Sequence, residues 1–146
     1  MIGEHYELNP KNKKKLFYFI SEESQGKILK VIGFQAVRGK IWNLYFGDIT
    51  ENGFSDAVVS NNADIYKVMN TVAVALYQFL EEYPEKVIRI VPVDDKRKRL
   101  YNIIFQRRIH EIEPNFHVFG KKRNKFEPYS PYKTHKIFEL RLKQKS

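Results

Sequence analysis

The sequence contains no cysteine, which excludes disulfide bonds, thiolate nucleophiles and cysteine-ligated metal sites. It contains no apolar run near the roughly 20 residues that span a bilayer, and its N-terminus has no apolar signal-peptide core. It also contains no phosphate-binding glycine loop, no G-x-S-x-G and no GxGxxG motif. We therefore expect a cytoplasmic protein with no membrane segment and no cofactor.

What is present is typical of a folded domain. The 146 residues are 42% hydrophobic and 14% aromatic, which disordered chains are not, and a chain of this length can bury a core without disulfides. The polar segment 1–12 predicts an N-terminal arm outside the core. We expect residues 1–146 to form a single domain.

The positive charge is confined to one part of the chain. Residues 1–92 contain 11 Lys and Arg against 11 Asp and Glu, whereas residues 93–146 contain 15 against 6. The whole net charge of +9 therefore follows Pro92. A one-sided excess of this kind attracts polyanions, so nucleic acid or an acidic protein is the expected partner.

The first half of the chain predicts antiparallel strands followed by a long helix. Apolar segments separated by turn residues place the strands at 15–21, 27–37 and 41–48, with a shorter fourth strand at 54–59. Asn61, Asn62 and Asp64 are candidate N-caps for a helix over residues 64–82, which Tyr83-Pro84 ends. The apolar face of this helix is expected to cover the sheet.

The second half predicts one more strand, a basic helix and C-terminal strands. The strand occupies residues 86–93, Asp94 or Asp95 caps a helix that ends at Ile112, and the last strand alternates Phe138, Leu140 and Leu142 with charged residues. The expected fold class is α+β: an antiparallel β-meander packed by a long helix, then a strand, a second basic helix and C-terminal strands. An exposed edge of the meander would permit a homodimer.

The second helix has arginines on its apolar side. At about 100° per residue, Arg97 and Arg108 fall among its inward-facing apolar residues. Such arginines either pair with a carboxylate, for which Asp48, Asp56 and Glu81 are candidates, or face a site for an anion. The run of residues 96–99 (KRKR) opposes the helix dipole, which suggests that it serves an anionic partner.

A surface for single-stranded nucleic acid requires cations for phosphates and flat rings for bases. The basic residues of the C-terminal half are interleaved with aromatic residues, which fits this requirement and equally fits a core with a solvated rim. The candidate nucleic-acid-binding residues are Lys96, Arg97, Arg99, Tyr101, Arg107, Arg108, Lys121, Lys122, Arg123, Lys125, Tyr129 and Arg141.

The alternative is a nuclease or a toxin-type enzyme. Asp94-x-Lys96 after a strand resembles the acidic-x-lysine element of metal-dependent nucleases, which needs a further carboxylate such as Asp48. His110 beside Arg107 could instead act as a general base without a metal. No standard metal-ligand spacing occurs, so we expect no metal site.

Two motifs carry a resemblance to a known family. Phe79-Leu80-x-x-Tyr83-Pro84 ends the first helix, and Arg97-x-Arg99-Leu100-Tyr101 opens the second. With these motifs, residues 46–120 resemble a family of uncharacterised small proteins common in Bacteroidetes. Relatives have a glycine-serine-threonine turn where this chain has the segment 92–95 (PVDD), which disfavours a phosphate turn. The resemblance implies a bacterial protein and supplies no activity.

The order of elements is also similar to that of the Whirly and PUR-type single-stranded nucleic-acid binders. We therefore expect a non-enzymatic protein that binds single-stranded DNA or RNA through a C-terminal basic and aromatic surface. The two alternatives are the nuclease and an adaptor for an acidic protein.

Overall fold

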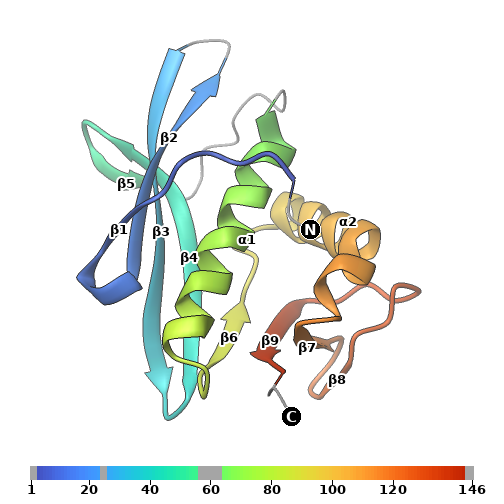
Figure 1. The fold of residues 1–146 in the computed structure, drawn as a ribbon. Coiled ribbons are helices and arrows are strands. Elements are labelled where there is room, and N and C mark those ends of the chain that lie inside the picture. The colour runs from blue at the N-terminus through green and yellow to red at the C-terminus, as the bar shows by residue number, and fades with distance from the viewer. Residues whose placement is uncertain (1–2, 24–25, 56–63, 144–146) are drawn as a thin grey trace. The chain divides into compact units, whose positions relative to one another are not determined.

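The computed structural model describes residues 3–23, 26–55 and 64–143, and in these it forms a mostly antiparallel nine-stranded sheet with two α-helices (Figure 1). The strand order is β1-β2-β3-β4-β6-β9-β7-β8, and β5 pairs with β4 outside this path. The elements are β1 (Asn9–Lys11), η1 (Asn12–Lys14), β2 (Leu16–Glu23), β3 (Gly26–Arg38), β4 (Ile41–Thr50), β5 (Gly53–Ser55), α1 (Ile65–Glu82), β6 (Val87–Ile90), α2 (Asp95–Ile112), β7 (Phe116–Lys121), β8 (Phe126–Pro128) and β9 (Ile137–Leu142).

The chain divides into two compact units. Unit 1 contains residues 1–35 and 45–83, and unit 2 contains residues 36–44 and 84–146. The long strands β3 and β4 pass through both units, and the turn between them belongs to unit 2. Gly39 in this turn has φ of +56°, a left-handed conformation that glycine adopts without strain.

Unit 1 is a sheet of β1 to β5 with α1 along one face (Figure 1). The covered face consists of alternate residues of β2 and β3, among them Phe17, Ile32 and Phe34, all buried. The ring of Phe34 stacks on Phe79 of α1 at a centroid distance of 4.2 Å. The period-2 pattern of the strands and the apolar stripe of the helix therefore meet in one core.

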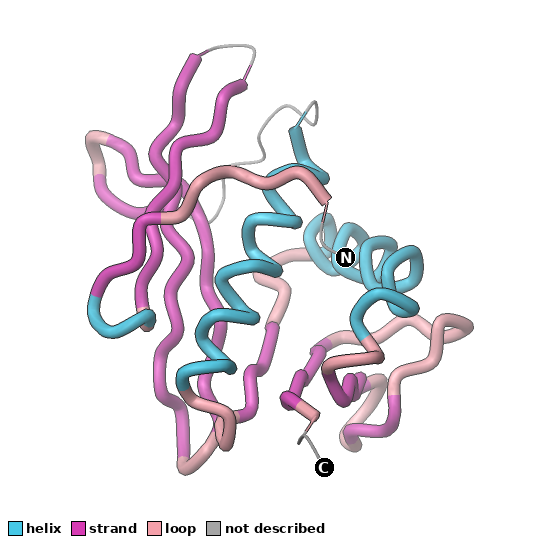
Figure 2. The backbone as a smooth tube through the Cα atoms, in the orientation of Figure 1, coloured by secondary structure: helices cyan, strands magenta, loops and turns pink. Residues whose placement is uncertain are grey.

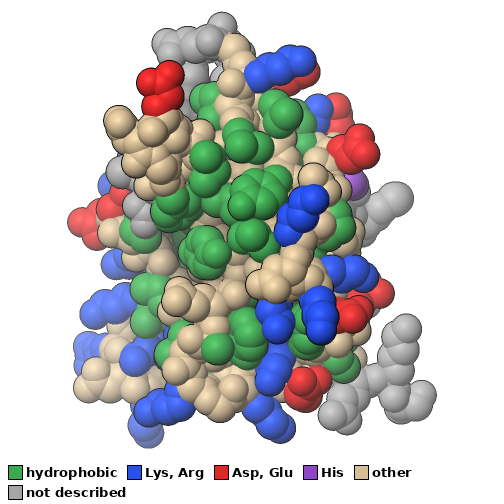
Figure 3. Space-filling view, turned by 90° about the vertical axis from the view of Figure 1, so that its left-hand side faces the viewer, with side chains coloured by type: hydrophobic (Ala, Val, Ile, Leu, Met, Phe, Trp, Pro, Cys, Tyr) green, Lys and Arg blue, Asp and Glu red, His purple; other side chains and the backbone are tan. Residues whose placement is uncertain are grey.

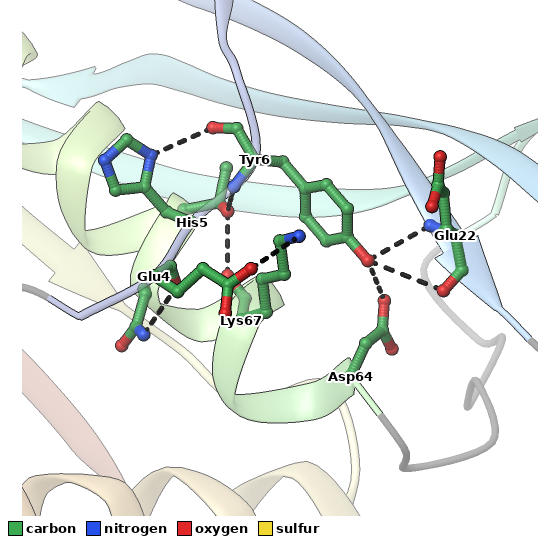
Figure 4. Close-up of polar contacts among 8 residues, drawn as sticks. Glu4, His5, Tyr6, Glu22, Asp64 and Lys67 are labelled. Atoms are coloured by element: carbon green, nitrogen blue, oxygen red, sulfur yellow. Dashed lines mark hydrogen bonds and ion pairs between the residues drawn. The ribbon is translucent and has the colours of Figure 1, made fainter.

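The N-terminal segment is held more firmly than its polar sequence suggests. The backbone N–H of Tyr6 donates to Thr71 Oγ1 at 2.8 Å, and Lys67 Nζ lies 3.2 Å from Glu4 Oε1 (Figure 4). Tyr6 also donates from its hydroxyl to Asp64 Oδ2 at 2.9 Å. The prediction of an arm outside the core was thus incomplete, since residues 4–6 dock on α1 and residues 9–11 form β1.

Unit 2 forms around β6, which is parallel to the first residues of β4. The last strand, β9, lies between β6 and β7 and is antiparallel to both. The ring of Phe105 in α2 stacks on Phe138 of β9 at 4.2 Å, which places α2 on the face of this sheet that carries Phe138 and Leu140. Figure 2 shows the loop that joins β8 to β9 beside these elements.

The predicted α+β class is confirmed, with corrections to its details. The strand expected at 54–59 is Gly53–Ser55, and residues 56–59 lie outside the described residues. Asp64 precedes α1 but makes no side-chain cap hydrogen bond, and its Oδ2 accepts the Tyr6 hydroxyl. Asn61 and Asn62 lie outside the described residues. Neither helix that the structure describes is long and apolar enough to cross a membrane.

Candidate functional site

The helix α2 begins at a strong cap. Asp94 has an extended backbone, and its Oδ1 accepts the N–H of Arg97 at 2.8 Å, as expected for an N-cap aspartate. Its Oδ2 lies 2.6 Å from Arg97 Nη1, so one carboxylate accepts hydrogen bonds from both the backbone N–H and the guanidinium of Arg97. This geometry fixes the first turn of the basic helix.

Arg97 is therefore a buried, paired residue. The prediction that it lies on the apolar side of the helix is confirmed, since it is buried with Phe105 and Ile109. An ion pair joins Arg97 to its own cap, Asp94. The carboxylates that the sequence analysis proposed for this ion pair, Asp48, Asp56 and Glu81, are more distant in sequence. Of those, Asp48 pairs with Lys30, Glu81 is exposed and Asp56 lies outside the described residues.

A groove lies in unit 2 between α2 and the segment 129–134 that leads from β8 to β9. The helix contributes residues spaced 3 or 4 apart, which share one face, and the loop contributes two tyrosines. Its volume is about 650 Å³, within the range of about 300–1,000 Å³ that small-molecule sites occupy. The groove is lined by Asp95, Lys98, Arg99, Asn102, Ile103, Gln106, Tyr129, Pro131, Tyr132, Lys133 and Thr134.

Asn102 fixes the loop to the helix. Its Nδ2 donates to the carbonyl oxygen of His135 and to that of Lys98, each at 2.8 Å, and its Oδ1 accepts the N–H of His135 at 2.8 Å. Gln106 Nε2 adds a donation to the carbonyl oxygen of Pro131 at 3.3 Å. The two walls of the groove are thus held by side-chain to backbone hydrogen bonds, which makes the groove a built feature of unit 2.

The charge of the groove is positive. Lys98, Arg99 and Lys133 contribute three cations, against the single carboxylate of Asp95. Lys133 is also 3.2 Å from Glu127, but both side chains are substantially exposed, and such a surface ion pair contributes at most about 1 kcal/mol. An anionic ligand would therefore meet at least two cations.

The two tyrosines of the groove differ in exposure. Tyr129 is half-buried, with its ring centroid 5.0 Å from that of His135 and 6.0 Å from that of Phe105, and burial raises its pKa. Tyr132 is 94% exposed, so its ring is presented to solvent. A flat ring beside cations is the arrangement on which an unpaired base stacks while its phosphate is neutralised.

Behind the loop lies a buried histidine that the sequence analysis missed. His135 is fully buried, and within the described residues neither of its ring nitrogens has a hydrogen-bond partner. Burial lowers its pKa, and the charges of Lys133 and Lys122 lower it further against Glu127, which raises it. A Cβ on Gly120 would lie 2.1 Å from Cδ2 of this ring, so only glycine fits beneath it. The histidine thus packs as a neutral ring that supports the groove.

The predicted nucleic-acid-binding residues occupy more than one place. Arg99 and Tyr129 line the groove, whereas Arg141 and Lys121 lie on the sheet over the rings of Phe119 and Phe126, at 5.0 and 5.5 Å. Exposed are Lys96, Arg107, Lys122, Arg123 and Lys125, and partly buried are Tyr101 and Arg108.

The face of Arg141 is less cationic than its sequence suggests. Glu139 is buried there, and it accepts hydrogen bonds from Arg89 Nε and Nη2 at 2.9 and 2.7 Å. Arg141 Nη2 lies 3.9 Å from the other oxygen of the same carboxylate. This surface therefore offers an anion less unpaired charge than the groove does.

The two carboxylates of the nuclease alternative each have a cationic partner. Both carboxylate oxygens of Asp94 serve Arg97, and Asp48 is buried in an ion pair with Lys30. Lys96 and His110 are exposed on α2. Within residues 3–23, 26–55 and 64–143 there is no group of three or more His, Cys, Asp or Glu side chains that could hold a metal ion.

Comparison with known proteins gives a family and no activity. No curated protein and no solved structure matches this chain. Residues 3–143 match the family of unknown function DUF6934, which takes in both units and the groove. Since this match extends over nearly the whole sequence, the chain belongs to the family of unknown function DUF6934.

Proposed function

We propose that this protein binds single-stranded DNA or RNA without cleaving it, through the groove between α2 and the segment 129–134. The observation that carries the proposal is the combination in one groove of three cations, Lys98, Arg99 and Lys133, with the exposed ring of Tyr132. Cations neutralise phosphates, and a free ring accepts a base that is not paired in a duplex.

The distribution of charge supports the same proposal. Unit 2 contains 19 Lys and Arg against 7 Asp and Glu, whereas unit 1 contains 7 against 10. A field of this sign and size draws polyanions toward the unit that contains the groove. The cations in the first turn of α2 are repelled by the helix dipole, and the Asp94 cap and Asp95 offset part of this repulsion.

A single strand fits the groove better than a duplex does. A volume of about 650 Å³ accommodates one or two nucleotides and not the width of a double helix. In a duplex the bases are already stacked, so Tyr132 would contribute nothing to binding. We therefore place the phosphate of the bound nucleotide near Lys98 and Arg99 and its base on Tyr132.

The test is a fluorescence-anisotropy titration of purified protein with labelled oligo-dT, oligo-rU and a duplex of equal length, at several salt concentrations. The proposal predicts binding to single strands that weakens steeply with salt, and weaker binding to the duplex. Lys98→Ala/Arg99→Ala is expected to reduce the slope of log K against log salt by about 1.4, since each phosphate contact on a single strand contributes about 0.7.

The matched control is Lys11→Ala/Lys40→Ala, which removes two exposed cations that do not line the groove and should leave the slope nearly unchanged. Equal losses in the two double variants would mean that binding is a general effect of net charge and would contradict the groove. If none of the three probes binds, the proposal is wrong and the cations of unit 2 serve an acidic protein instead. A shortened probe after incubation would show a nuclease.

A further inference from the structure

The groove of unit 2 has a closed end and an open end. Its helical wall is a stripe of α2 whose members lie three or four residues apart, among them Asp95, Arg99, Asn102 and Gln106. Asn102 and Gln106 donate to carbonyl oxygens of the segment that leads from β8 to β9, so this segment closes that end. Asp95 and Arg99 precede them on the helix and are exposed. A ligand therefore meets the first turns of α2 at the open end.

The open end carries side chains of both signs that the protein itself does not use. Asp95 precedes Lys98 and Arg99 by three and four residues, the spacings at which side chains of one helix are neighbours. Within the described residues, no ion pair or hydrogen bond engages any of these three side chains. The adjacent carboxylate, Asp94, instead places both of its oxygens on Arg97. An available carboxylate thus lies beside two available cations.

A nucleotide that matches both signs must bring hydrogen-bond donors as well as a phosphate. An ionised carboxylate only accepts hydrogen bonds, and two parallel donors engage both of its oxygens. Guanine offers such a pair, since its N1–H and its 2-amino group lie side by side on one edge. Adenine and cytosine place a ring nitrogen acceptor next to their amino group, and thymine and uracil place a carbonyl oxygen on each side of N3–H. Guanine is therefore the base whose edge best fits one carboxylate.

The ring in the groove leaves the edge of a bound base free. Tyr132 is 94% exposed and lines the same groove as Asp95, so a base stacked on it is held by its face alone. Stacking of this kind accepts every base and does not select one. Selection must come from a group that contacts the edge, and the carboxylate of Asp95 is placed in the groove wall to do this.

We propose that Asp95 makes the groove selective for guanine by accepting hydrogen bonds from N1–H and the 2-amino group. This inference rests on the proposed function, because it concerns the same groove and adds the identity of the base. The observations that carry it are the unpaired carboxylate, its place one turn before Arg99 in the same wall, and the exposed ring of Tyr132. A good bidentate contact to a base discriminates by about 5- to 150-fold.

The test is fluorescence anisotropy with labelled oligo-dT and with the same strand in which one central thymidine is replaced by deoxyguanosine, deoxyinosine or deoxyadenosine. The deoxyadenosine strand controls for the stronger stacking of purines, and the deoxyguanosine strand should bind about 5- to 150-fold more tightly than it. Deoxyinosine lacks the 2-amino group and should bind with intermediate affinity. Equal binding of the guanine and adenine strands would overturn the proposal.

A fifth probe identifies the edge of guanine that is read. A strand with 7-deazaguanine keeps N1–H and the 2-amino group but lacks the N7 acceptor, so it should bind as the guanine strand does. Arginine reads guanine through O6 and N7. Weaker binding of the 7-deazaguanine strand would therefore place the contact on Arg99 and overturn the role of Asp95.

Asp95→Asn replaces one carboxylate oxygen with a donor and should bring the affinity ratio of the guanine and adenine strands close to one. The loss of a negative charge should strengthen the binding of both strands, so the ratio is the measurement that matters. The matched control is Glu111→Gln, which removes an exposed carboxylate of α2 that does not line the groove and should leave the ratio unchanged. Because Asp94 keeps the cap, α2 should form in both variants. An unchanged ratio in Asp95→Asn would mean that this carboxylate contributes charge alone.

Competition with free nucleotides allows the two proposals to fail separately. GMP should displace the labelled guanine strand better than UMP does, but less well than the same strand without its label. Displacement by GMP as effective as that by the strand would keep the guanine site and contradict the proposal of a single-strand binder. Salt-dependent binding of all strands with equal affinity would keep the single-strand binder and overturn the selectivity. If no strand and no nucleotide binds, both proposals are wrong.

Discussion

The two units differ in the side chains that they leave exposed. Unit 1 buries an ion pair of Lys30 and Asp48 and leaves apolar side chains exposed (Figure 3), among them Ile20, Leu29 and Phe54. Unit 2 exposes most of its described cations, although Arg97 is buried beside its cap Asp94. It also buries a histidine whose ring has no hydrogen-bond partner among the described residues. A buried pair that is satisfied favours one arrangement of the strands, whereas an unpaired buried ring is tolerated only while it stays neutral. The difference suggests a scaffold in unit 1 and a ligand site in unit 2.

The largest expected effect comes from breaking the ion pair of unit 1. Lys30 Nζ lies 2.5 Å from Asp48 Oδ1, and both side chains are buried. Lys30→Met leaves a buried carboxylate without its cation, which should reduce the free energy of unfolding by about 3–5 kcal/mol. Urea denaturation followed by circular dichroism measures this loss.

The control is the double variant Lys30→Met/Asp48→Leu, which replaces the pair with apolar groups and should recover most of the lost stability. Trp42 is the only tryptophan and belongs to unit 2, so its fluorescence reports that unit separately. If Lys30→Met shifts the circular dichroism and not the fluorescence, the two units unfold independently. An unchanged midpoint in Lys30→Met would show that the pair does not stabilise unit 1.

A second comparison uses the glycines that lie under rings in each unit. Gly120→Ala would drive a Cβ into the fully buried ring of His135, which cannot move aside, and should destabilise by about 1–3 kcal/mol. Gly33→Ala meets the ring of Tyr45, which is 37% exposed and can rotate into solvent, so its cost should be smaller. Thermal denaturation of both variants gives the ranking.

The same pair of variants should differ in ligand binding. His135 is bonded through its backbone to Asn102, so Gly120→Ala should displace the groove loop and weaken single-strand binding, whereas Gly33→Ala should not. His135→Ala added to Gly120→Ala removes the clash and should restore part of the stability. The opposite ranking, with Gly33→Ala the more harmful, would mean that the ring of Tyr45 is held more rigidly over its glycine than the ring of His135 is.

The two tyrosines of the groove allow binding to be separated from folding. Tyr132→Ala should weaken single-strand binding by about 5- to 150-fold, the range found for one base stacked on one ring. It should leave the free energy of unfolding within about 0.5 kcal/mol, since the side chain is 94% exposed. Tyr132→Phe keeps the ring and should bind nearly as well as the wild type.

Tyr129→Ala is expected to reduce both quantities, because its ring contacts Phe105 and His135 as well as the groove. For each of the three variants, fluorescence anisotropy gives the affinity for a single strand and urea denaturation gives the free energy of unfolding. Tight binding by Tyr132→Ala would remove base stacking from the proposed mechanism and leave only the phosphate contacts.

The sequence predicted the parts that depend on local chemistry. The alternating strands, the apolar stripe of α1 and the Asp94 cap of α2 were all predicted from residues within a few positions of one another. The parallel pairing of β6 with β4 was not, because it joins residues more than 40 positions apart and leaves no local signature.

The groove was predicted only in part for the same reason. Its helical wall could have been recognised, since the six residues from Asp95 to Gln106 share one face by their spacing. Its other wall depends on the Asn102 to His135 hydrogen bonds, which link positions 33 residues apart. A single histidine between a threonine and a lysine carries no pattern, so neither its burial nor its support of the loop could be inferred.

The smallest and most specific effect concerns pH. Burial lowers the pKa of His135 below its usual value of about 6.5, so the folded state favours the neutral ring. The unfolded chain then binds more protons than the folded one between the two pKa values. Stability is complete above the unfolded pKa, near 6.5, and declines as the pH falls toward the lower folded pKa. Denaturation midpoints between pH 8 and pH 5 should therefore decrease on the acid side.

His135→Phe keeps a buried ring and removes the titrating group, so its stability should depend less on pH over the same range. The fluorescence of Trp42 in unit 2 should follow the acid loss, because His135 belongs to that unit. A wild type and a His135→Phe variant with the same acid slope would mean that other groups, and not the buried ring, set the acid sensitivity of the groove.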